Sequence, residues 1–446
     1  MKTSKHIFYF VLIFFGALAI GIGALLVVQA IPSTNLQKNA ATALAVFEKA
    51  GIQRPSLAKN LNAMRVDYYG DAHMYQLSFG VPGATAWTNA LYPHSYFEPD
   101  HPDALNNVQE VAGLKARLQG TPADADNGRY WNGFIIPMKI FGSVFSYSGL
   151  RIFNIVLLAA LFIVAVILLG RMLGWSYAIC FFLSLIIMWV WVVPFCLEYL
   201  SVFYIMGAGV VAILWLAKKG KLIKWGPETF LILGILTAYF DLFTAPLVTL
   251  GFPLVVAVLC LLRSQHRSDF GYVAKRVLLW TGVWLAGFAG FWAVKIVMTQ
   301  ALFGQGVLAD AGSRFGVYTG VEGNMSLLYT IFGLAFPANL GNIFGTKGQD
   351  VRPVITSAWI NTIPSALLLC APPAVAALLA RLRKKRLGAA WTLPLIALFP
   401  FLRMMVTAVH TGWNSFFTFR ELGVAFFACF VFCAYLLTLI RRTKNG

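Results

Sequence analysis

The sequence predicts an all-α, polytopic membrane protein, and its composition and its apolar runs are the observations that predict it. Hydrophobic residues make up 59% of the 446 positions and charged residues only 12%, and the mean hydropathy is +0.73. These values lie far outside the usual composition of soluble globular domains. A bilayer core about 30 Å thick needs roughly 20 apolar residues per helical crossing, so we expect one integral-membrane domain over residues 1–446 with about 10–12 transmembrane helices.

Ten apolar runs are near the length of a crossing. They begin near Phe8, Ile152, Tyr177, Ser201, Thr229, Ala245, Val277, Ala358, Ala389 and Val424. The first run lies within residues 1–31 and follows Lys2 and Lys5, as the apolar region of a signal peptide would. It is longer than the apolar region of a typical signal peptide, and the chain behind it is itself membrane-embedded, so we expect an uncleaved membrane anchor. The other nine runs fall within residues 132–298 and 358–446.

The basic residues predict the orientation of the helices, because Lys and Arg beside short loops stay on the cytoplasmic side. With a cytoplasmic N-terminus, ten crossings return the C-terminus to the cytoplasm. This side then holds 19 of the 35 Lys and Arg residues but only two acids, Glu228 and Asp269. The asymmetry indicates this topology and an attraction to anionic membrane lipids as partners. We expect a plasma-membrane protein with both termini cytoplasmic and an extracytoplasmic active face. The asymmetry explains the net charge of +18 without a nucleic-acid partner.

Residues 32–131 form a long external loop in this topology, and we expect surface helices in it. The stretch "NLQKNAATALAVFEKAG" has apolar residues at helical spacing and ends on a glycine, which is typical of an amphipathic helix with a C-cap. The stretch "PSLAKNLNAMRVDYYG" has the same spacing and begins with Pro55, a favoured first-turn residue. We therefore expect two amphipathic helices on the outer membrane surface.

Two further apolar segments are not expected to cross. The stretch "NGFIIPMKIFGSVFSYSG" contains Pro137 and Lys139, which favours an interfacial or re-entrant helix. In the external segment 299–357, the Gly-rich part is expected to be a loop. The segment 325–345 behind it is apolar enough to cross, but a single extra crossing would move "RLRKKR" to the outside and break the charge rule. A re-entrant or surface helix is expected there instead.

Ionisable residues near the apolar runs gather at the outer boundary, and the midplane is almost free of charge. They are Glu198, Asp241, Lys295, Arg403, His410 and Arg420. Because charge inside hydrocarbon is costly, this distribution predicts one polar cavity in the outer leaflet. Structural alternatives stay open: the basic side chains would extend to headgroups, Glu198 would solvate a helix end, His410 would be an ordinary loop residue, and Asp241 would cap a turn.

The external loop holds two polar clusters. The stretch "DYYGDAHMYQLSFG" places two aspartates, a histidine and three tyrosines together, and we expect its Asp71 near the membrane face, held by aromatic anchors. The alternative is that Asp71 N-caps a helix starting at Ala72. The second cluster has metal-ligand types in a Pro-punctuated loop without helical spacing, so no metal site is predicted, and the sequence does not support a divalent cation as cofactor. Its members are His94, Glu98, Asp100, His101 and Asp103.

This layout resembles the integral-membrane C-type glycosyltransferases, the GT-C superfamily. The resemblance rests on the many helices and on "GDAHMYQ" and "NGRYWNG" in the long first loop. The stretch "HTGWNSFFTFR" near the C-terminus resembles the external histidine and arginine segment of uncharacterised bacterial membrane proteins with this layout. The resemblance to the GT-C superfamily implies transfer of a sugar from a polyprenyl-phosphate-linked donor to an extracytoplasmic acceptor, which is a cell-envelope glycan, a lipid or a protein. The first loop lacks the adjacent Asp-Asp or Asp-Glu pair of that family, which leaves metal dependence and the identity of the base open.

The residue types fit that chemistry. Asp71 is the first candidate for the base that deprotonates the acceptor hydroxyl, and Glu198 and Asp241 are the others. Basic side chains would hold the lipid phosphate, while two aromatic residues would pack against a sugar or anchor the chain at the interface. The substrate-binding candidates are Arg129, Tyr130, Trp131, Lys295, Arg403, His410 and Arg420. A transporter or flippase of a lipid-linked sugar, which would favour charges near the midplane, and a non-enzymatic scaffold of envelope assembly are the alternatives.

Overall fold

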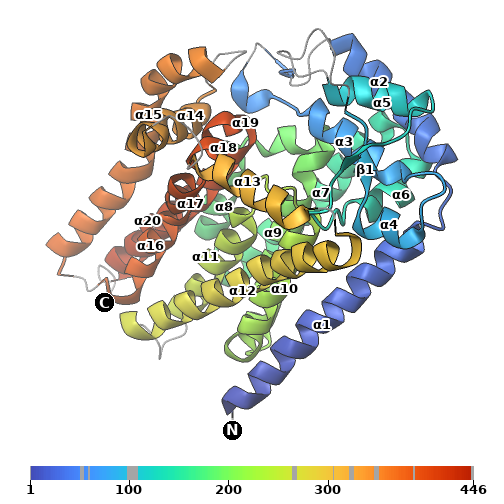
Figure 1. The fold of residues 1–446 in the computed structure, drawn as a ribbon. Helices are drawn as coiled ribbons and strands as arrows, with labels where there is room; N and C mark the ends of the chain where they lie inside the picture. The colour runs from blue at the N-terminus through green and yellow to red at the C-terminus, as the bar shows by residue number, and fades with distance from the viewer. Residues whose placement is uncertain are drawn as a thin grey trace.

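The computed structural model describes residues 2–50, 55–58, 61–97, 109–263, 269–304, 306–320, 326–345, 351–384 and 387–442. Within these residues the protein is almost entirely helical (Figure 1). The one sheet there pairs β1 (His94–Ser95) with β2 (Ala125–Asp126) in antiparallel register. The all-α, polytopic class predicted from the sequence is confirmed, because the described part contains seven helices long and apolar enough to cross a membrane.

The seven candidate spans match seven of the ten predicted runs. They are α1 (Lys2–Val28), α7 (Tyr147–Leu173), α9 (Leu200–Lys218) with η4 (Leu197–Tyr199) before it, α12 (Phe270–Phe303), α15 (Val351–Leu382), the segment of η6 (Gly388–Trp391), α16 (Thr392–Ala397) and α17 (Phe399–Val406), and α20 (Leu422–Arg442) with α19 (Ser415–Thr418) and η7 (Phe419–Glu421) before it. The spans differ in exposure. In the most apolar stretch of α1, 17% of the residues are buried, whereas 61% are buried in the corresponding stretch of η4 and α9. The peripheral helices therefore present apolar faces that suit lipid.

The remaining three runs form α8 (Trp175–Ile187), α10 (Leu222–Phe240) and α11 (Leu247–Arg263). With 13 residues, α8 is about 20 Å long and is shorter than a bilayer core. After α8 the chain continues into the 3₁₀ segment η3 (Val190–Phe195). The 19-residue helix α10 packs closely on α12 at a pair of glycines. A Cβ atom on Gly234 would lie 2.2 Å from the Trp284 carbonyl oxygen, so glycine is what permits this helix contact.

The long loop forms a helical layer at one end of the bundle. In Figure 1 this layer lies at the upper right, at the end of α1 opposite the N-terminus. It consists of α2 (Thr34–Ala50), η1 (Asn62–Met64), α3 (Tyr68–Phe79), α4 (Ala86–Leu91), α5 (Gln109–Leu118) and α6 (Ile135–Val144). The predicted helix α2 is confirmed, and it buries Leu36, Ala40, Ala43 and Phe47. We call this end of the bundle the loop side.

The prediction of a second surface helix beginning at Pro55 is wrong. Within the described residues, the segment from Pro55 to Val66 forms a short hairpin in which Ser56 and Arg65 form an antiparallel bridge. The amide of Val66 donates to the carbonyl of Pro55 at 3.1 Å. The backbone groups that a helix would use are thus paired across the hairpin, and the next helix, α3, begins only at Tyr68.

Two predictions for the external segment 299–357 had different outcomes. The Gly-rich segment expected to be a loop forms helix α13 (Val307–Thr319), with Gly306 and Gly320 in left-handed conformations at its two ends. Gly306 thus precedes the first residue of the helix, and Gly320 ends it, as a left-handed glycine commonly does at a helix C-terminus. The apolar segment behind it is helical as η5 (Tyr329–Ala335) and α14 (Phe336–Asn342), two seven-residue pieces. Its relation to the membrane, re-entrant or on the surface, stays a prediction.

Candidate functional site

A cavity of about 610 Å³ lies between α10, α11, α12, α13 and α17. Its lining is mostly aliphatic and aromatic, and on α12 it extends from Thr281 to Trp292. That stretch is about 16 Å long at about 1.5 Å per residue. The charged lining residues come from four separate segments and are Arg129, Asp241, Arg314 and Arg403. This space, called the α12 cavity below, joins a long apolar surface to a small charged cluster.

A break between α10 and α11 forms one wall of the α12 cavity. Asp241 follows the last residue of α10, and its carboxylate accepts hydrogen bonds from the Thr244 amide at 3.1 Å and the Thr244 hydroxyl at 2.6 Å. Phe243 between them has a φ of 66°, a left-handed conformation that a bulky side chain rarely adopts. Such strained positions persist only where the surroundings hold them, and they are frequent at functional sites.

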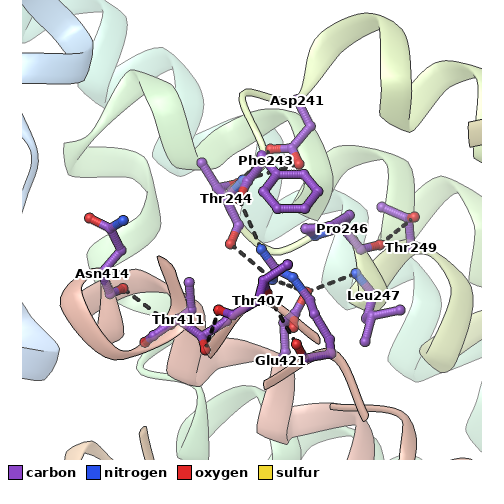
Figure 2. Close-up of polar contacts among 12 residues, drawn as sticks. Asp241, Phe243, Thr244, Pro246, Leu247, Thr249, Thr407, Thr411, Asn414 and Glu421 are labelled. Carbon is purple, nitrogen blue, oxygen red and sulfur yellow. Dashed lines mark hydrogen bonds and ion pairs between the residues drawn. The ribbon is translucent and has the colours of Figure 1, made fainter. Parts of the chain in front are cut away.

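Arg403 and Glu421 hold this break from the side of α17 and α20. The Arg403 guanidinium donates to the Phe243 carbonyl at 3.0 Å and to the Thr244 carbonyl at 3.4 Å. It also pairs with the buried Glu421 carboxylate at 2.5 Å, which accepts from the Leu247 amide at 2.9 Å. Figure 2 shows Glu421 beside Leu247 and below Thr244. Because backbone groups freed by a helix break need partners in apolar surroundings, Arg403 is engaged in the interior and does not extend to headgroups.

The loop side of the cavity carries a second charged group. Arg129, from the loop before α6, pairs with Asp310 on α13 at 2.6 Å. Arg314, one turn further along α13, faces the same carboxylate at 3.7 Å. The hydroxyl groups of Tyr130 and Tyr318 lie 3.4 Å apart. Two arginines, Arg129 from the loop before α6 and Arg314 from α13, therefore meet at the Asp310 carboxylate beside the cavity.

Asp241 is the carboxylate among the lining residues of the α12 cavity. Burial raises its pKa to about 6, although the hydrogen bonds from Thr244 and the charge of Arg403 oppose the shift. A carboxylate with a pKa near neutrality is well suited to accept a proton in a reaction. The arrangement therefore places a basic group, two guanidinium groups and an apolar channel in one space.

Asp71 occupies a different place, deep inside the loop-side layer. Its carboxylate is fully buried and accepts hydrogen bonds from the Tyr147 hydroxyl at 2.5 Å and the Leu197 amide at 2.8 Å. Burial raises the pKa of Asp71 to about 6, against the hydrogen bond from Tyr147 and the charge of Arg151. It does not line the α12 cavity. A second cavity, of about 320 Å³, has Met74 and Leu197 in its lining and no charged side chain.

The alternative in which Asp71 N-caps a helix is wrong. Asp67 is the N-cap of α3, and its carboxylate accepts from the amides of Tyr69 at 3.1 Å and Gly70 at 3.3 Å. Asp71 lies one turn inside the helix and bonds to the segment before α9 instead. Its hydrogen bonds therefore join α3, α7 and η4.

The other predicted residues fall into two groups. Tyr130 lines the α12 cavity with Arg129, Asp241 and Arg403, and the His410 ring packs on two aromatic neighbours of that wall, Phe243 at 5.2 Å and Tyr318 at 4.7 Å. The rest do not line it.

Each of those remaining residues contacts another part of the interior. Trp131 is fully buried and donates to the Phe291 carbonyl at 2.8 Å. The Lys295 ammonium donates to the Leu91 carbonyl. Arg420 donates to the Phe416 carbonyl at 2.8 Å. Glu198 lies against Gly70 of α3. The single cavity expected from the sequence thus gathers only part of the predicted set.

Sequence reasoning missed the contributions of α13 and of Glu421. Asp310, Arg314 and Tyr318 are spaced four residues apart, which puts them on one face of a helix. This spacing was a usable signal, but the surrounding glycines favoured a loop. Glu421 directly follows Arg420 in the sequence, and only the fold shows that it pairs with Arg403.

No group of three or more His, Cys, Asp or Glu side chains in the described residues is placed to hold a metal ion. Of the histidine and acid cluster considered from the sequence, His94 is described, whereas Glu98, Asp100, His101 and Asp103 lie outside the described residues. Comparisons with protein-family models, curated proteins and solved structures found no match to this chain. The fold and site thus define a class, a polytopic helical membrane protein with an amphipathic cavity.

Proposed function

We propose that this protein is a plasma-membrane glycosyltransferase that moves a sugar from a polyprenyl-phosphate-linked donor to an extracytoplasmic acceptor. The observation that carries the proposal is the α12 cavity, which has a long apolar lining with arginines among its lining residues. A polyprenyl phosphate has the matching chemistry, an apolar chain with an anionic group at its end. The resemblance of the sequence to the C-type glycosyltransferases supports the same reaction class.

In this proposal the donor lies along α12. Its isoprenoid chain contacts apolar side chains such as Leu285 and Phe288, and its phosphate lies near Arg129 and Arg314. Guanidinium groups bind phosphate oxygens with charge-assisted hydrogen bonds. The same contacts stabilise the negative charge that develops on the phosphate as it leaves.

Asp241 is the base in this scheme. Its carboxylate removes the proton of an acceptor hydroxyl while the hydroxyl oxygen forms a bond to the anomeric carbon of the sugar. The bond from that carbon to the phosphate oxygen breaks, and its electron pair stays on the phosphate. Asp71 was the first candidate for the base in the sequence. It is a positioning residue in this scheme, because its carboxylate is enclosed by hydrogen-bond donors and lines neither cavity.

A flippase for a lipid-linked sugar is the second candidate, and the helix break favours it. Transporters often build their substrate sites from discontinuous helices, and the segment from Asp241 to Leu247 with its Arg403–Glu421 pair is of that kind. Both functions need the same lipid in the same cavity. They differ in whether the bond between sugar and phosphate breaks.

One reconstitution distinguishes the two functions. Purified protein in liposomes would receive a radiolabelled polyprenyl-phosphate hexose and a cell-envelope acceptor fraction. The transferase proposal expects free polyprenyl phosphate and labelled acceptor to accumulate together. Movement of intact donor between leaflets without release of polyprenyl phosphate would establish the flippase instead. Protein-free liposomes and the Asp241→Asn variant are the controls.

A further inference from the structure

The Arg129 guanidinium in the lining of the α12 cavity is positioned as an anion site. Its side chain is 18% exposed, and its Nε atom is buried without a hydrogen-bond partner in the part of the chain that the structure describes. Arg314 brings a second guanidinium to the same carboxylate of Asp310. Two arginines that converge on one carboxylate present the donors that a phosphate ester binds.

Helix α13 brings Asp310 to this position and also covers the cavity. Phe315 and Tyr318 on α13 line the α12 cavity. The start of the helix is fixed, because Val307 packs in an apolar cluster with Ile296. Leu308, the residue after Val307, is 61% exposed. The contacts of α13 with the Arg129 loop are polar, so they can be exchanged for contacts with an anionic ligand.

We propose that the Asp310 carboxylate is an internal competitor, which occupies the phosphate subsite of Arg129 and Arg314 until a lipid phosphate displaces it. The inference rests on the ligand class of the proposed function and not on sugar transfer. A ligand that must first break an ion pair binds more weakly than it would to the free subsite. Asp310 thus sets the affinity for the lipid phosphate and its release after the reaction.

A structural role for Asp310 makes a different prediction. The residue lies in the first turn of α13, where a negative charge is stabilising. If Asp310 only stabilised the helix, its replacement would lower stability and leave lipid affinity equal or weaker. If it competes with the phosphate, its replacement tightens binding. The sign of the change in affinity therefore separates the two roles.

The experiment is a titration of detergent-purified protein with sugar-free polyprenyl phosphate, followed by native mass spectrometry. We expect Asp310→Asn and Asp310→Ala to bind roughly 1.5-fold to fivefold more tightly than wild type, the range of a partly exposed ion pair. Arg129→Ala should bind about tenfold more weakly. In the Arg129→Ala background, most of the effect of Asp310→Asn should disappear, because the two residues share one interaction.

A control variant and two control ligands test whether the phosphate group and the lipid chain are both needed for binding. Asp124→Asn removes the same charge from an exposed loop-side position and should bind like wild type. The alcohol polyprenol should bind equally to wild type and Asp310→Asn, because it has no phosphate. Inorganic phosphate should compete weakly, since it lacks the chain.

The outcomes separate the two proposals. Equal or weaker binding of polyprenyl phosphate by both Asp310 variants, with wild-type elution and thermal stability, overturns the competitor role alone. Failure of wild type and both variants to bind polyprenyl phosphate, or equal affinity for polyprenol, overturns the proposed function as well. Tighter binding by an Asp310 variant that is independent of Arg129 also contradicts the proposed subsite.

Discussion

Asp71 and Asp241 have similar electrostatics but very different surroundings. Both carboxyl groups are buried, and burial raises the pKa of each to about 6. Asp71 accepts from the backbone amides of Leu197 and Glu198 and from Tyr147, so it joins α3 of the loop-side layer to α7 and η4. Asp241 bonds within one local turn to Thr244 and lines the α12 cavity.

A perturbed pKa therefore shows that a carboxylate is buried, and it does not show that a substrate can reach that carboxylate. A raised pKa at a site can arise from purely structural burial. What distinguishes Asp241 is an adjoining volume with apolar walls and free space for a ligand. We therefore expect the Asp241 region to carry the chemistry and the Asp71 region to hold the fold together.

The largest effect is expected from exchanging each aspartate for asparagine. Asp241→Asn should lower sugar transfer by roughly 10² to 10⁴, the range for loss of a general base, while donor binding stays near wild type. The amide oxygen can still accept from Thr244, so the turn should be retained. Asp71→Asn is the matched control, and it should lower thermal stability while the folded protein keeps its rate. The reverse pattern, with transfer lost only in Asp71→Asn, would contradict the division.

The next effect concerns the pair that holds the helix break. Glu421→Gln leaves the buried Arg403 charge without its counter-charge, and breaking a buried ion pair costs about 3–5 kcal/mol. We expect a large fall in thermal stability in detergent, because the carbonyls of the break depend on Arg403. Lys115→Ala is the control, since its pair with Glu48 is exposed. A stability loss no greater than that of the control would show that the pair does not hold the break.

The smallest effect is the pH dependence. The base must be ionised to accept a proton, so transfer should fall about tenfold per pH unit below the pKa of Asp241, about 6. Protonation of Asp71 has no such consequence for transfer. It affects stability instead, because a carboxyl with a raised folded-state pKa loses stabilising effect as the pH rises from about 4 to about 6. A transfer profile that stays flat down to pH 4 in wild type would exclude Asp241 as the base.

The sequence predicted the helical class because apolar composition and run length are enough for that inference. It also predicted α2, whose apolar spacing matches its buried face. It failed for the hairpin after Pro55, where backbone pairing overrides helical spacing, and for α13, where glycines lie at the helix ends.

The site was harder to predict than the fold. Residues such as Arg129, Asp241 and Arg403 were found because charged side chains are rare in an apolar chain. Their partners Asp310 and Glu421 are more than a dozen positions away along the sequence, and no local pattern links them. Which buried acid adjoins a cavity depends on packing between helices, which spacing along one helix does not contain.

The most direct test of the proposed donor site is a structure of the protein with bound polyprenyl-phosphate donor. We expect the lipid chain along α12 beside Phe288, the phosphate within hydrogen-bond distance of Arg129 and Arg314, and the sugar next to Asp241. A donor bound instead in the second cavity, with its headgroup toward Asp71, would contradict the central claim.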